Sequence, residues 1–437
     1  SELVVGLYVA GKALGGTTTD HGSGVTGTHR SSCERTPPVV KQDTTNIQYD
    51  LVKCAFHGSH SILTAVGDTK QRIMVWAGAL KGVFRRFKSD FDAKVFRPAN
   101  NYRAAPRLVR ILHHLSLALD PHSVRPTPTD DGADGEGECR VLVFSDHRDE
   151  ANHLASLVEH WIDRDGVQPR DICVLTRNRP ADYGHYLVEA LSNRGICARV
   201  ENELQDLLAE PIATAILDLL KLACRRRAPE AWSATVDLLL DLRGETADRS
   251  GLRVERQVQH HVAMLRLLLP SLSHDRGGTS TAVTRIVDFL GRAALVASHP
   301  QYRQGTYLDD QISGFVSHMS NCRRSATWDE AIDALEGVDS VPVMTMHKSK
   351  GLEYHTVVFV GLEDDALWGW RKGEREELCG FFVAFSRAEK RVIFTFSRRR
   401  PKRPGDTPSR QSRSTICKLY ELLEEAGVEI EDMNATT

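Results

Sequence analysis

The stretch VPVMTMHKSKGLEYHTVVFV, residues 341–360, contains two apolar runs that flank a polar turn. Residues 341–346 and 356–360 have the length and composition of buried strands. The turn between them offers Thr, His and Lys donors beside Gly351, a residue type that allows close approach of a ligand or another backbone. Such a strand end suits a phosphate-rich partner, and the plainer alternative is a polar connection between two strands.

Further strands and helices are predicted on both sides of this stretch. Apolar runs next to turn residues predict strands, and segments with apolar residues at helical spacing predict helices. The predicted strands are residues 62–66, 140–144, 172–176, 196–200 and 392–396, and the predicted helices are residues 151–162, 183–193, 376–390 and 416–426. Helices that alternate with strands are typical of an α/β fold with a parallel sheet.

Residues 210–335 have a different pattern. Apolar side chains recur at helical spacing at Ile212, Ile216, Leu219 and Ala223, and no strand is predicted. This segment is therefore interpreted as a helical domain inserted into the α/β fold.

A second polar signal lies near the C-terminus, in the segment FVAFSRA at residues 382–388. An arginine on a helix beside a sheet edge can direct its planar guanidinium at a developing phosphoryl charge, and Arg387 is the candidate for this role. The plainer alternative is a helix-surface arginine in a salt bridge.

In this order, residues 345–353 and 382–388 resemble motifs V and VI of the UvrD/Rep-type superfamily 1 helicases. The segment VGDTKQRIMVWAGA at residues 66–79 resembles motif III, and Asn101-Tyr102-Arg103 resembles motif IV. The four segments stand in the family order, which argues against a chance resemblance.

The resemblance implies a RecA-like helicase domain with a parallel sheet (2A), interrupted by a helical insertion (2B) and preceded by a remnant of the first RecA-like domain (1A). The implied boundaries are 39–95 for the 1A remnant, 96–209 and 339–397 for 2A, and 210–338 for 2B. Residues 1–38 are predicted to be a disordered or non-native leader, and residues 398–437 a basic linker and a C-terminal helix.

The resemblance also implies an ATP site. Gln71 is expected to sense the terminal phosphate, and Arg103 and Arg387 to contact the γ-phosphate from across a domain cleft. Tyr102 is expected to pack on the adenine and Glu353 to meet the ribose. The expected catalytic residues are Gln71, Arg103 and Arg387, and the expected nucleotide-binding residues are Tyr102, Arg103, Gly351, Glu353 and Arg387.

A DNA-binding set follows from the same resemblance. Trp76 is expected to stack on a base of single-stranded DNA, a contact that grips any sequence. Thr345, His347 and Lys350 complete the expected DNA-binding set, with Thr345 and His347 on the DNA backbone. The basic run at residues 398–403 is a further candidate for phosphate contacts, and a solvated tail is the alternative.

The chain departs from the family pattern in its first half. Residues 42–48 match the second half of motif II, but Val39 and Val40 stand where the family has an Asp-Glu pair that holds Mg²⁺ and positions water. In motif III, Met74 replaces an aromatic residue and Ala77 an arginine. The phosphate-loop candidate, Gly6 with residues 11–13, has alanine where a Mg²⁺-binding Ser or Thr belongs and lies too close to motif II. No metal site is predicted, and the leader suggests a truncation or a shifted reading frame.

The predicted function is an ATP-dependent DNA helicase or translocase that moves 3′ to 5′ and unwinds duplex DNA in repair, recombination or replication restart. ATP and Mg²⁺ are the expected cofactors, and single-stranded and duplex DNA, with repair or recombination proteins, the expected partners. The chain alone is expected to be inactive because motif I and the acidic pair are absent. The alternatives are a fragment or pseudo-helicase that binds single-stranded DNA without hydrolysing ATP, and a helicase subunit of a nuclease complex.

The composition of the chain indicates where DNA could bind and in which compartment the protein is expected. The chain of 437 residues has 41% hydrophobic and 26% charged residues and a net charge of −2, so any DNA binding must arise from local basic patches. No apolar run is long enough to cross a bilayer and no signal-peptide layout is visible, so a cytoplasmic, nucleoid-associated protein without a membrane partner is expected. The nine cysteines lack metal-ligand spacing and are expected to be reduced and mostly buried.

Overall fold

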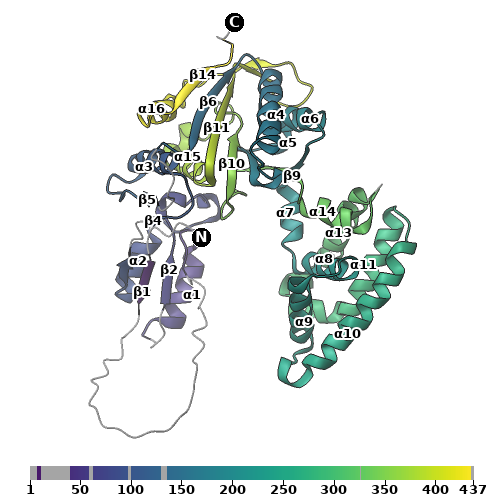
Figure 1. The fold of residues 1–437 in the computed structure, drawn as a ribbon. Coiled ribbons are helices and arrows are strands. Elements are labelled where there is room, and N and C mark those ends of the chain that lie inside the picture. Colours follow the sequence, from purple (N-terminus) through teal and green to yellow (C-terminus); the bar gives the residue numbers. More distant parts are fainter. Residues whose placement is uncertain are drawn as a thin grey trace. The chain divides into compact units, whose positions relative to one another are not determined.

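The structure is a computed structural model, and it describes residues 7–10, 40–58, 63–96, 100–128, 135–324 and 326–434 (Figure 1). The chain divides into two compact units. Unit 1 consists of Ser1–Leu154, Cys173–Leu187 and Thr345–Thr437, and unit 2 of Ala155–Ile172 and Val188–Met344. The phosphate-loop candidate and Val39 lie outside the described residues.

A small three-stranded sheet in the order β2-β1-β3 lies in unit 1. Its strands are β1 (Leu7–Ala10), β2 (Leu63–Val66) and β3 (Lys94–Phe96), with β1 antiparallel to both neighbours. The helices α1 (Asn46–Phe56) and α2 (Val83–Phe91) contribute to the same hydrophobic core. Its fully buried members include Val40, Tyr49, Ala65 and Phe87. The predicted strand at 62–66 is thus confirmed for its described residues.

The prediction of a leader without regular structure is wrong for Leu7–Ala10. This segment forms the central strand of the small sheet, and its backbone pairs with residues 63–66 and 94–96. A run of four residues carries too little periodicity to predict a strand, so the pairing depends on partners far along the chain.

The main sheet has seven strands in the order β14-β6-β11-β10-β7-β9-β8. The strands are β6 (Glu138–Phe144), β7 (Ile172–Thr176), β8 (Cys197–Val200), β9 (Ser340–Thr345), β10 (Tyr354–Phe359), β11 (Ala388–Ser397) and β14 (Glu429–Asp432). The pairings of β6, β10 and β14 with their neighbours in unit 1, and of β8 with β9 in unit 2, are parallel. The predicted α/β fold with a parallel sheet is confirmed.

Three helices pack together against unit 1's part of this sheet (Figure 1): α3 (Pro106–Leu119), α15 (Trp370–Phe385) and α16 (Cys417–Glu425). Aromatic contacts attach α15 to β10 and β11, because Phe381 lies 4.8 Å from Phe394 and 6.1 Å from Phe359 between ring centroids. The remaining helices of the α/β part are α4 (His147–Asp163), α5 (Pro180–Tyr183) and α6 (His185–Ser192), with a 3₁₀ turn at Pro169–Asp171.

Two predictions for the C-terminal region need correction. The helix predicted at 376–390 ends at Phe385, because residues from Ala388 onward pair with β10 and β6 as strand β11. The strand β14 was not predicted, since its sequence Glu-Ile-Glu-Asp has one apolar residue, and pairing with β6 establishes it. Residues 398–437 therefore extend the sheet in addition to forming the predicted helix α16.

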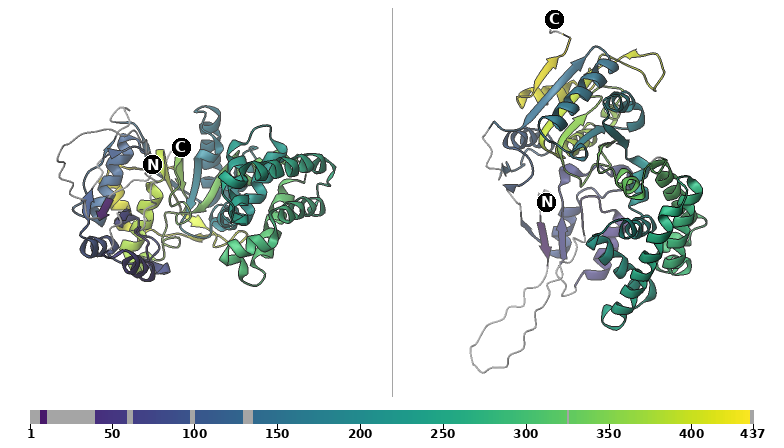
Figure 2. Two further views of the ribbon diagram at one scale, coloured as in Figure 1. Left: turned by 90° about the horizontal axis from the view of Figure 1, so that it is seen from below. Right: turned by 45° about the vertical axis from the view of Figure 1, so that its right-hand side comes forward.

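Unit 2 contains a bundle of helices between β8 and β9, and Figures 1 and 2 show them gathered side by side. They are α7 (Asn202–Leu208), α8 (Pro211–Cys224), α9 (Pro229–Arg243), α10 (Ala247–Leu268), α11 (Arg276–Leu290), α12 (Arg292–Ser298), α13 (Tyr307–Cys322) and α14 (Trp328–Glu336), with 3₁₀ turns at Leu269–Ser271 and Pro300–Arg303. The helix α8 is buried around most of its circumference and packs against α7, α9, α10, α11, α13 and α14. Residues 210–335 were predicted to contain helices and no strands, and the described residues of this segment contain no strand.

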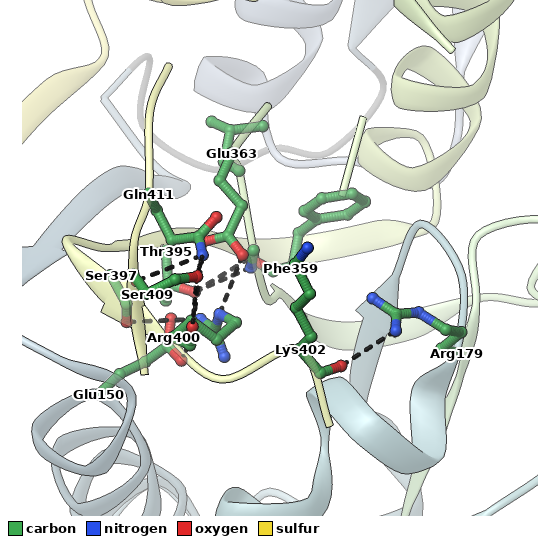
Figure 3. Close-up of polar contacts among 12 residues, drawn as sticks. Glu150, Arg179, Phe359, Glu363, Thr395, Ser397, Arg400, Lys402, Ser409 and Gln411 are labelled. Carbon is green, nitrogen blue, oxygen red and sulfur yellow. Dashed lines mark hydrogen bonds and ion pairs between the residues drawn. The ribbon is translucent and has the colours of Figure 1, made fainter. Parts of the chain in front are cut away.

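The basic run at 398–403 is not a solvated tail at every position. Arg400, in the short strand β12 (Arg399–Arg400) that pairs with β13 (Ser409–Arg410), is 5% exposed. Figure 3 shows its guanidinium between Glu150 and Glu363, and Nη2 donates to Glu150 Oε2 at 2.5 Å while Nε lies 3.1 Å from Glu363 Oε1. Arg400 is therefore a buried structural residue, and the expected DNA-phosphate contact is wrong for this side chain.

Membrane and cysteine features can be stated for the described part of the chain. None of its helices combines the length and apolar character needed to span a membrane. Its cysteines are free thiols, and Cys54, Cys197 and Cys417 are exposed, so the expectation of mostly buried thiols is wrong for these three. The short strands β4 (Asn100–Asn101) and β5 (Thr127–Pro128) form a separate pair next to α3.

Candidate functional site

A cavity of about 260 Å³ lies in unit 1, where several polar segments that are distant in sequence meet. It is lined by Lys41, Gln42, Asp43, Val66, Gly67, Asp68, Gln71, Arg103, Lys350, Gly351 and Arg387. Four of the residues predicted for the ATP site, Gln71, Arg103, Gly351 and Arg387, are therefore brought together. Lys41, Gln42, Asp43 and Asp68 were not predicted as site residues, although all four lie in or beside the segments that carried the family resemblance.

Arg387 lies in the turn between α15 and β11, not on a helix as predicted, because α15 ends at Phe385. Its guanidinium is almost completely buried and donates to Val383 O and Leu352 O, both at 3.1 Å. Nη2 donates to Ser386 Oγ at 2.9 Å and lies 3.5 Å from Gln71 Oε1. These acceptors direct the guanidinium toward the segment that carries Gln71.

Arg103 approaches the same turn from the other end of the sequence. Its Nη1 donates to Ser386 O at 2.9 Å, and its Nη2 forms an ion pair with Glu353. The pKa of Glu353 lies below its usual value although burial raises it, because the Arg103 guanidinium stabilises the carboxylate. Ser386 thus connects the two predicted phosphate-binding arginines, one through its hydroxyl and one through its carbonyl.

Lys350, predicted to contact DNA, lies in the lining of this cavity. Its ammonium donates to Gln71 O at 2.8 Å and forms an ion pair with Asp43. Burial lowers the pKa of Lys350, and the neighbouring Asp43 carboxylate works in the opposite direction. The ammonium connects the segment that resembles motif II, the segment that resembles motif III and its own segment around one cavity.

Asp68 follows β2 and is 2% exposed. Its Oδ1 accepts from the backbone N–H of Lys70 at 2.9 Å and lies 3.0 Å from the Lys70 ammonium. A Cβ at the preceding residue, Gly67, would lie 2.1 Å from Gln42 Oε1 and 2.8 Å from Phe84 Cζ, so a larger residue would have to displace these two side chains. Close packing of Gly67 against Gln42 therefore sets the wall of the cavity.

The helix α15 also comes unusually close to the segment that carries Thr345 and His347. A Cβ at Gly380 would lie 2.3 Å from Met346 Cε, so a larger residue would have to displace the end of the Met346 side chain. Thr345 ends β9 and its carbonyl accepts from Lys348 N at 3.0 Å, which forms the turn. The two segments that resemble motifs V and VI are in direct contact, because Arg387 of one donates to Leu352 O of the other.

His347 is half-buried in this turn. Burial lowers its pKa to about 4, and the nearby Arg177 guanidinium lowers it further. Arg177 is itself held by Glu377, with Nε donating to Oε2 at 2.7 Å and Nη2 to Oε1 at 2.6 Å. At neutral pH His347 is therefore an uncharged imidazole.

The two predicted aromatic contacts lie at the surface. Trp76 is in a 3₁₀ turn, Val75–Ala77, and is 77% exposed, while Tyr102 is 71% exposed. The Tyr102 hydroxyl accepts from Asn100 Nδ2 at 3.1 Å. Neither ring contributes to the lining of the cavity, and both rings are mainly exposed to solvent.

The segment that resembles motif II places Val40 in an apolar position. Val40 is 0% exposed and pairs in parallel with Ala65, and its carbonyl accepts from Val66 N at 2.9 Å. Asp43 Oδ1 and Asp68 Oδ2 are buried oxygens without a partner in the described chain, but each carboxylate already faces a lysine ammonium. Among the residues that the structure describes, no group of three or more His, Cys, Asp or Glu side chains is arranged as a metal site. The described residues therefore fit a phosphate better than they fit Mg²⁺.

Two family models match the chain. One is described as the UvrD-like helicase C-terminal domain and matches residues 314–399, and the other as the UvrD/REP helicase N-terminal domain and matches residues 41–92. Over these two segments the chain is similar to the UvrD/Rep helicases. The two matches contain Gln71, Trp76 and the segments of motifs V and VI, and Tyr102 and Arg103 fall between them.

Similar full-length proteins support this relationship to UvrD/Rep helicases. DNA helicase II of Escherichia coli is 25% identical over 82% of this chain and 55% of its own length. The ATP-dependent DNA helicase Rep of Escherichia coli is 24% identical over 82% of this chain and 59% of its own length. DNA helicase II of Haemophilus influenzae is 24% identical over 82% of this chain and 54% of its own length. This chain therefore spans about half the length of the curated relatives that it matches.

Proposed function

We propose that this chain is the C-terminal portion of an ATP-dependent DNA helicase or translocase of the UvrD/Rep type. The observation that supports this most is the meeting of Gln71, Lys350 and Arg387 around one cavity, because the three residues come from the two segments matched by separate helicase family models. A phosphate held there would connect both segments.

We propose that the γ-phosphate of ATP is held by the two arginines. Their planar guanidiniums can each donate two hydrogen bonds to phosphate oxygens, and they neutralise the charge that develops during phosphoryl transfer. Gln71 lies 3.5 Å from the Arg387 guanidinium, which supports the proposal that it senses the terminal phosphate. Tyr102, Gly351 and Glu353 are proposed to complete the nucleotide site on the side of the adenine and ribose.

DNA is proposed to contact Trp76, Thr345 and His347, with Lys350 shared between the DNA-binding and phosphate-binding groups. Because His347 is uncharged at neutral pH, its contact with a DNA phosphate is a hydrogen bond and not an ion pair. ATP binding and hydrolysis would close and reopen the cleft while these contacts step along one strand. Movement from 3′ to 5′, a role in repair, recombination or replication restart, and association with the nucleoid and its repair proteins belong to the same proposal.

A second candidate is a chain that binds single-stranded DNA without hydrolysing ATP. The observation that favours it is the fully buried Val40 at the position where the family places an acidic residue. A valine cannot position water or hold the Mg²⁺ that ATP brings, and Asp43 and Asp68 are each engaged by lysines. We therefore expect turnover by this chain alone to be close to background.

The test measures three properties of the full chain: binding of a fluorescent ATP analogue, binding of single-stranded DNA, and ATP hydrolysis with and without DNA. We expect nucleotide and DNA binding with hydrolysis near background. Arg387→Ala should abolish nucleotide binding, whereas the exposed Arg371→Ala should not. Strong DNA-stimulated hydrolysis would reject the second candidate, and the absence of both nucleotide and DNA binding would reject the helicase proposal.

A further inference from the structure

The helix α10 in unit 2 carries a groove that the proposed ATP and DNA sites do not use. It has a volume of about 780 Å³ and lies between α10, the end of α9 and Phe289 of α11. Its floor is a stacked pair of rings, His261 and Phe289, whose centroids are 3.9 Å apart at an angle of 5°. The Nε2 atom of His261 is buried and has no partner among the residues that the structure describes.

The groove is basic. Arg243, Arg253 and Arg256 line it together with a single carboxylate, that of Asp248. Two of these arginines are held in place, since Arg243 donates to Gln257 and Arg253 forms an ion pair with Glu245. Guanidiniums held in this way present preorganised donors to the carboxylates of a ligand.

An apolar stripe continues from the groove along the same face of α10. Leu252, Met264 and Leu267 are 74%, 55% and 79% exposed. At 100° per residue, these positions and the groove residues Arg256 and His260 lie on one side of the helix. The stripe from 252 to 267 is about 22 Å long, which is four turns of helix. Met264 and Leu267 are neighbours on this face, while Leu252 lies at the other end with Arg256 and His260 between them, so the face combines apolar and basic groups.

The mixture of groups identifies the kind of partner. A nucleic-acid backbone would satisfy the arginines but would leave the leucines and the methionine without an apolar surface to contact. A helix with acidic residues around an apolar i, i+4, i+7 stripe satisfies both, because its apolar residues cover Leu252, Met264 and Leu267 while its carboxylates reach the arginines.

We propose that this face of α10 docks an acidic amphipathic helix of a partner protein, with Leu252 and Leu267 as apolar anchors and Arg243, Arg253 and Arg256 as carboxylate contacts. This inference rests on unit 2 alone and does not depend on the proposed function.

The test uses the full chain and a fluorescein-labelled synthetic helix in which leucines at i, i+4, i+7 and i+11 are surrounded by glutamates. Two control peptides keep its composition in scrambled order or replace every glutamate by lysine, and a duplex DNA oligomer is the fourth probe. We expect the first peptide to bind, and Leu252→Ser with Leu267→Ser, or Arg256→Glu, to weaken it about tenfold or more. Arg227→Glu, the same charge change at an exposed position outside the groove, should leave binding unchanged.

Circular dichroism of each variant checks that α10 remains folded, as expected for exposed positions. The proposal is overturned if the acidic helix does not bind, or if the scrambled peptide binds equally well. It is also overturned if duplex DNA alone binds and Arg256→Glu removes that binding, because the face would then be a nucleic-acid surface.

Discussion

At the scale of single residues, the hydrogen bonds and ion pairs of two buried arginines in unit 1 distinguish a site residue from a structural one. Arg387 donates to acceptors in α15, in the turn after Gly351 and in its own turn, and it reaches Gln71 at 3.5 Å. Arg400 is similarly buried, but it is enclosed by two carboxylates and does not line the cavity that Arg387 lines. Two buried arginines in one unit thus have different roles because of the acceptors around them.

Glu363 should make the stability of the protein depend on pH. Burial raises its pKa from the ordinary 4.5 to about 7, the neighbouring Glu150 carboxylate adds to this shift, and the Arg400 guanidinium opposes it. A carboxyl group whose pKa is raised by folding contributes stability that is complete below the unfolded pKa and is lost as pH rises through the folded pKa. As pH rises from 5 to 8, we expect the thermal midpoint of the wild type to fall relative to that of Glu363→Gln. Glu230→Gln, at an exposed position, is the control, and a pH-independent difference between wild type and Glu363→Gln would contradict this assignment.

Trp76 should carry a measurable part of the affinity for single-stranded DNA. Its ring is 77% exposed in a short turn, and base stacking on such a ring contributes about 1–3 kcal/mol. Trp76→Ala should therefore weaken oligothymidine binding about 5- to 150-fold, while Trp76→Phe should retain most of the affinity. Fluorescence anisotropy with a labelled oligonucleotide measures both variants, and unchanged binding by Trp76→Ala would remove this residue from the DNA-binding set.

At the scale of elements, contacts between helices and strands decide where the functional residues lie. The aromatic face of α15 packs on β10 and β11, and Gly380 allows it to approach Met346. These contacts place the turn after α15 next to the turn after β9. In unit 2, α8 is buried on most sides, so the surrounding helices depend on it for their common core.

Arg323 should stabilise the packing of α13 and α14 and of the turn at Ser273 in unit 2. It is 1% exposed at the end of α13, donates to Ser273 O at 3.0 Å, and stacks 3.6 Å from the ring of Trp328 at the start of α14. Arg323→Met removes a charged hydrogen bond and a desolvated cation–π contact, a loss of about 2–3 kcal/mol. We expect the thermal midpoint of unit 2 to fall by about 5 °C. Arg324→Met, one residue along and exposed, should change it by less than about 1 °C, and equal effects of the two variants would contradict the assignment.

At the scale of the whole molecule, each of the two units has its own hydrophobic core, and the proposed ATP site lies entirely in unit 1. Folding of chains with more than one core often departs from a single two-state transition. The chain also spans only about half the length of the curated relatives that it matches.

Calorimetry of the full chain should show more than one unfolding transition. A nucleotide that binds only to unit 1 raises the transition of that unit by mass action and leaves the transition of unit 2 in place. We expect an ATP analogue to have this effect on wild type and to lose it in Arg387→Ala. A uniform shift of all transitions would show that the two units unfold together or that nucleotide binds elsewhere.

The sequence by itself determined the α/β class, the parallel strands and the helical character of residues 210–335, because the periodicity of apolar residues is a local property that short segments already express. It also identified the segments that meet at the cavity through their resemblance to helicase motifs. Only the tertiary structure decided that Lys350 faces Asp43 and Gln71, that Arg400 is buried between two glutamates, and that Leu7–Ala10 and Glu429–Asp432 are strands. Each of these features depends on residues that are distant in the chain. The local sequence does not specify which strand or which carboxylate a segment will contact in the folded protein.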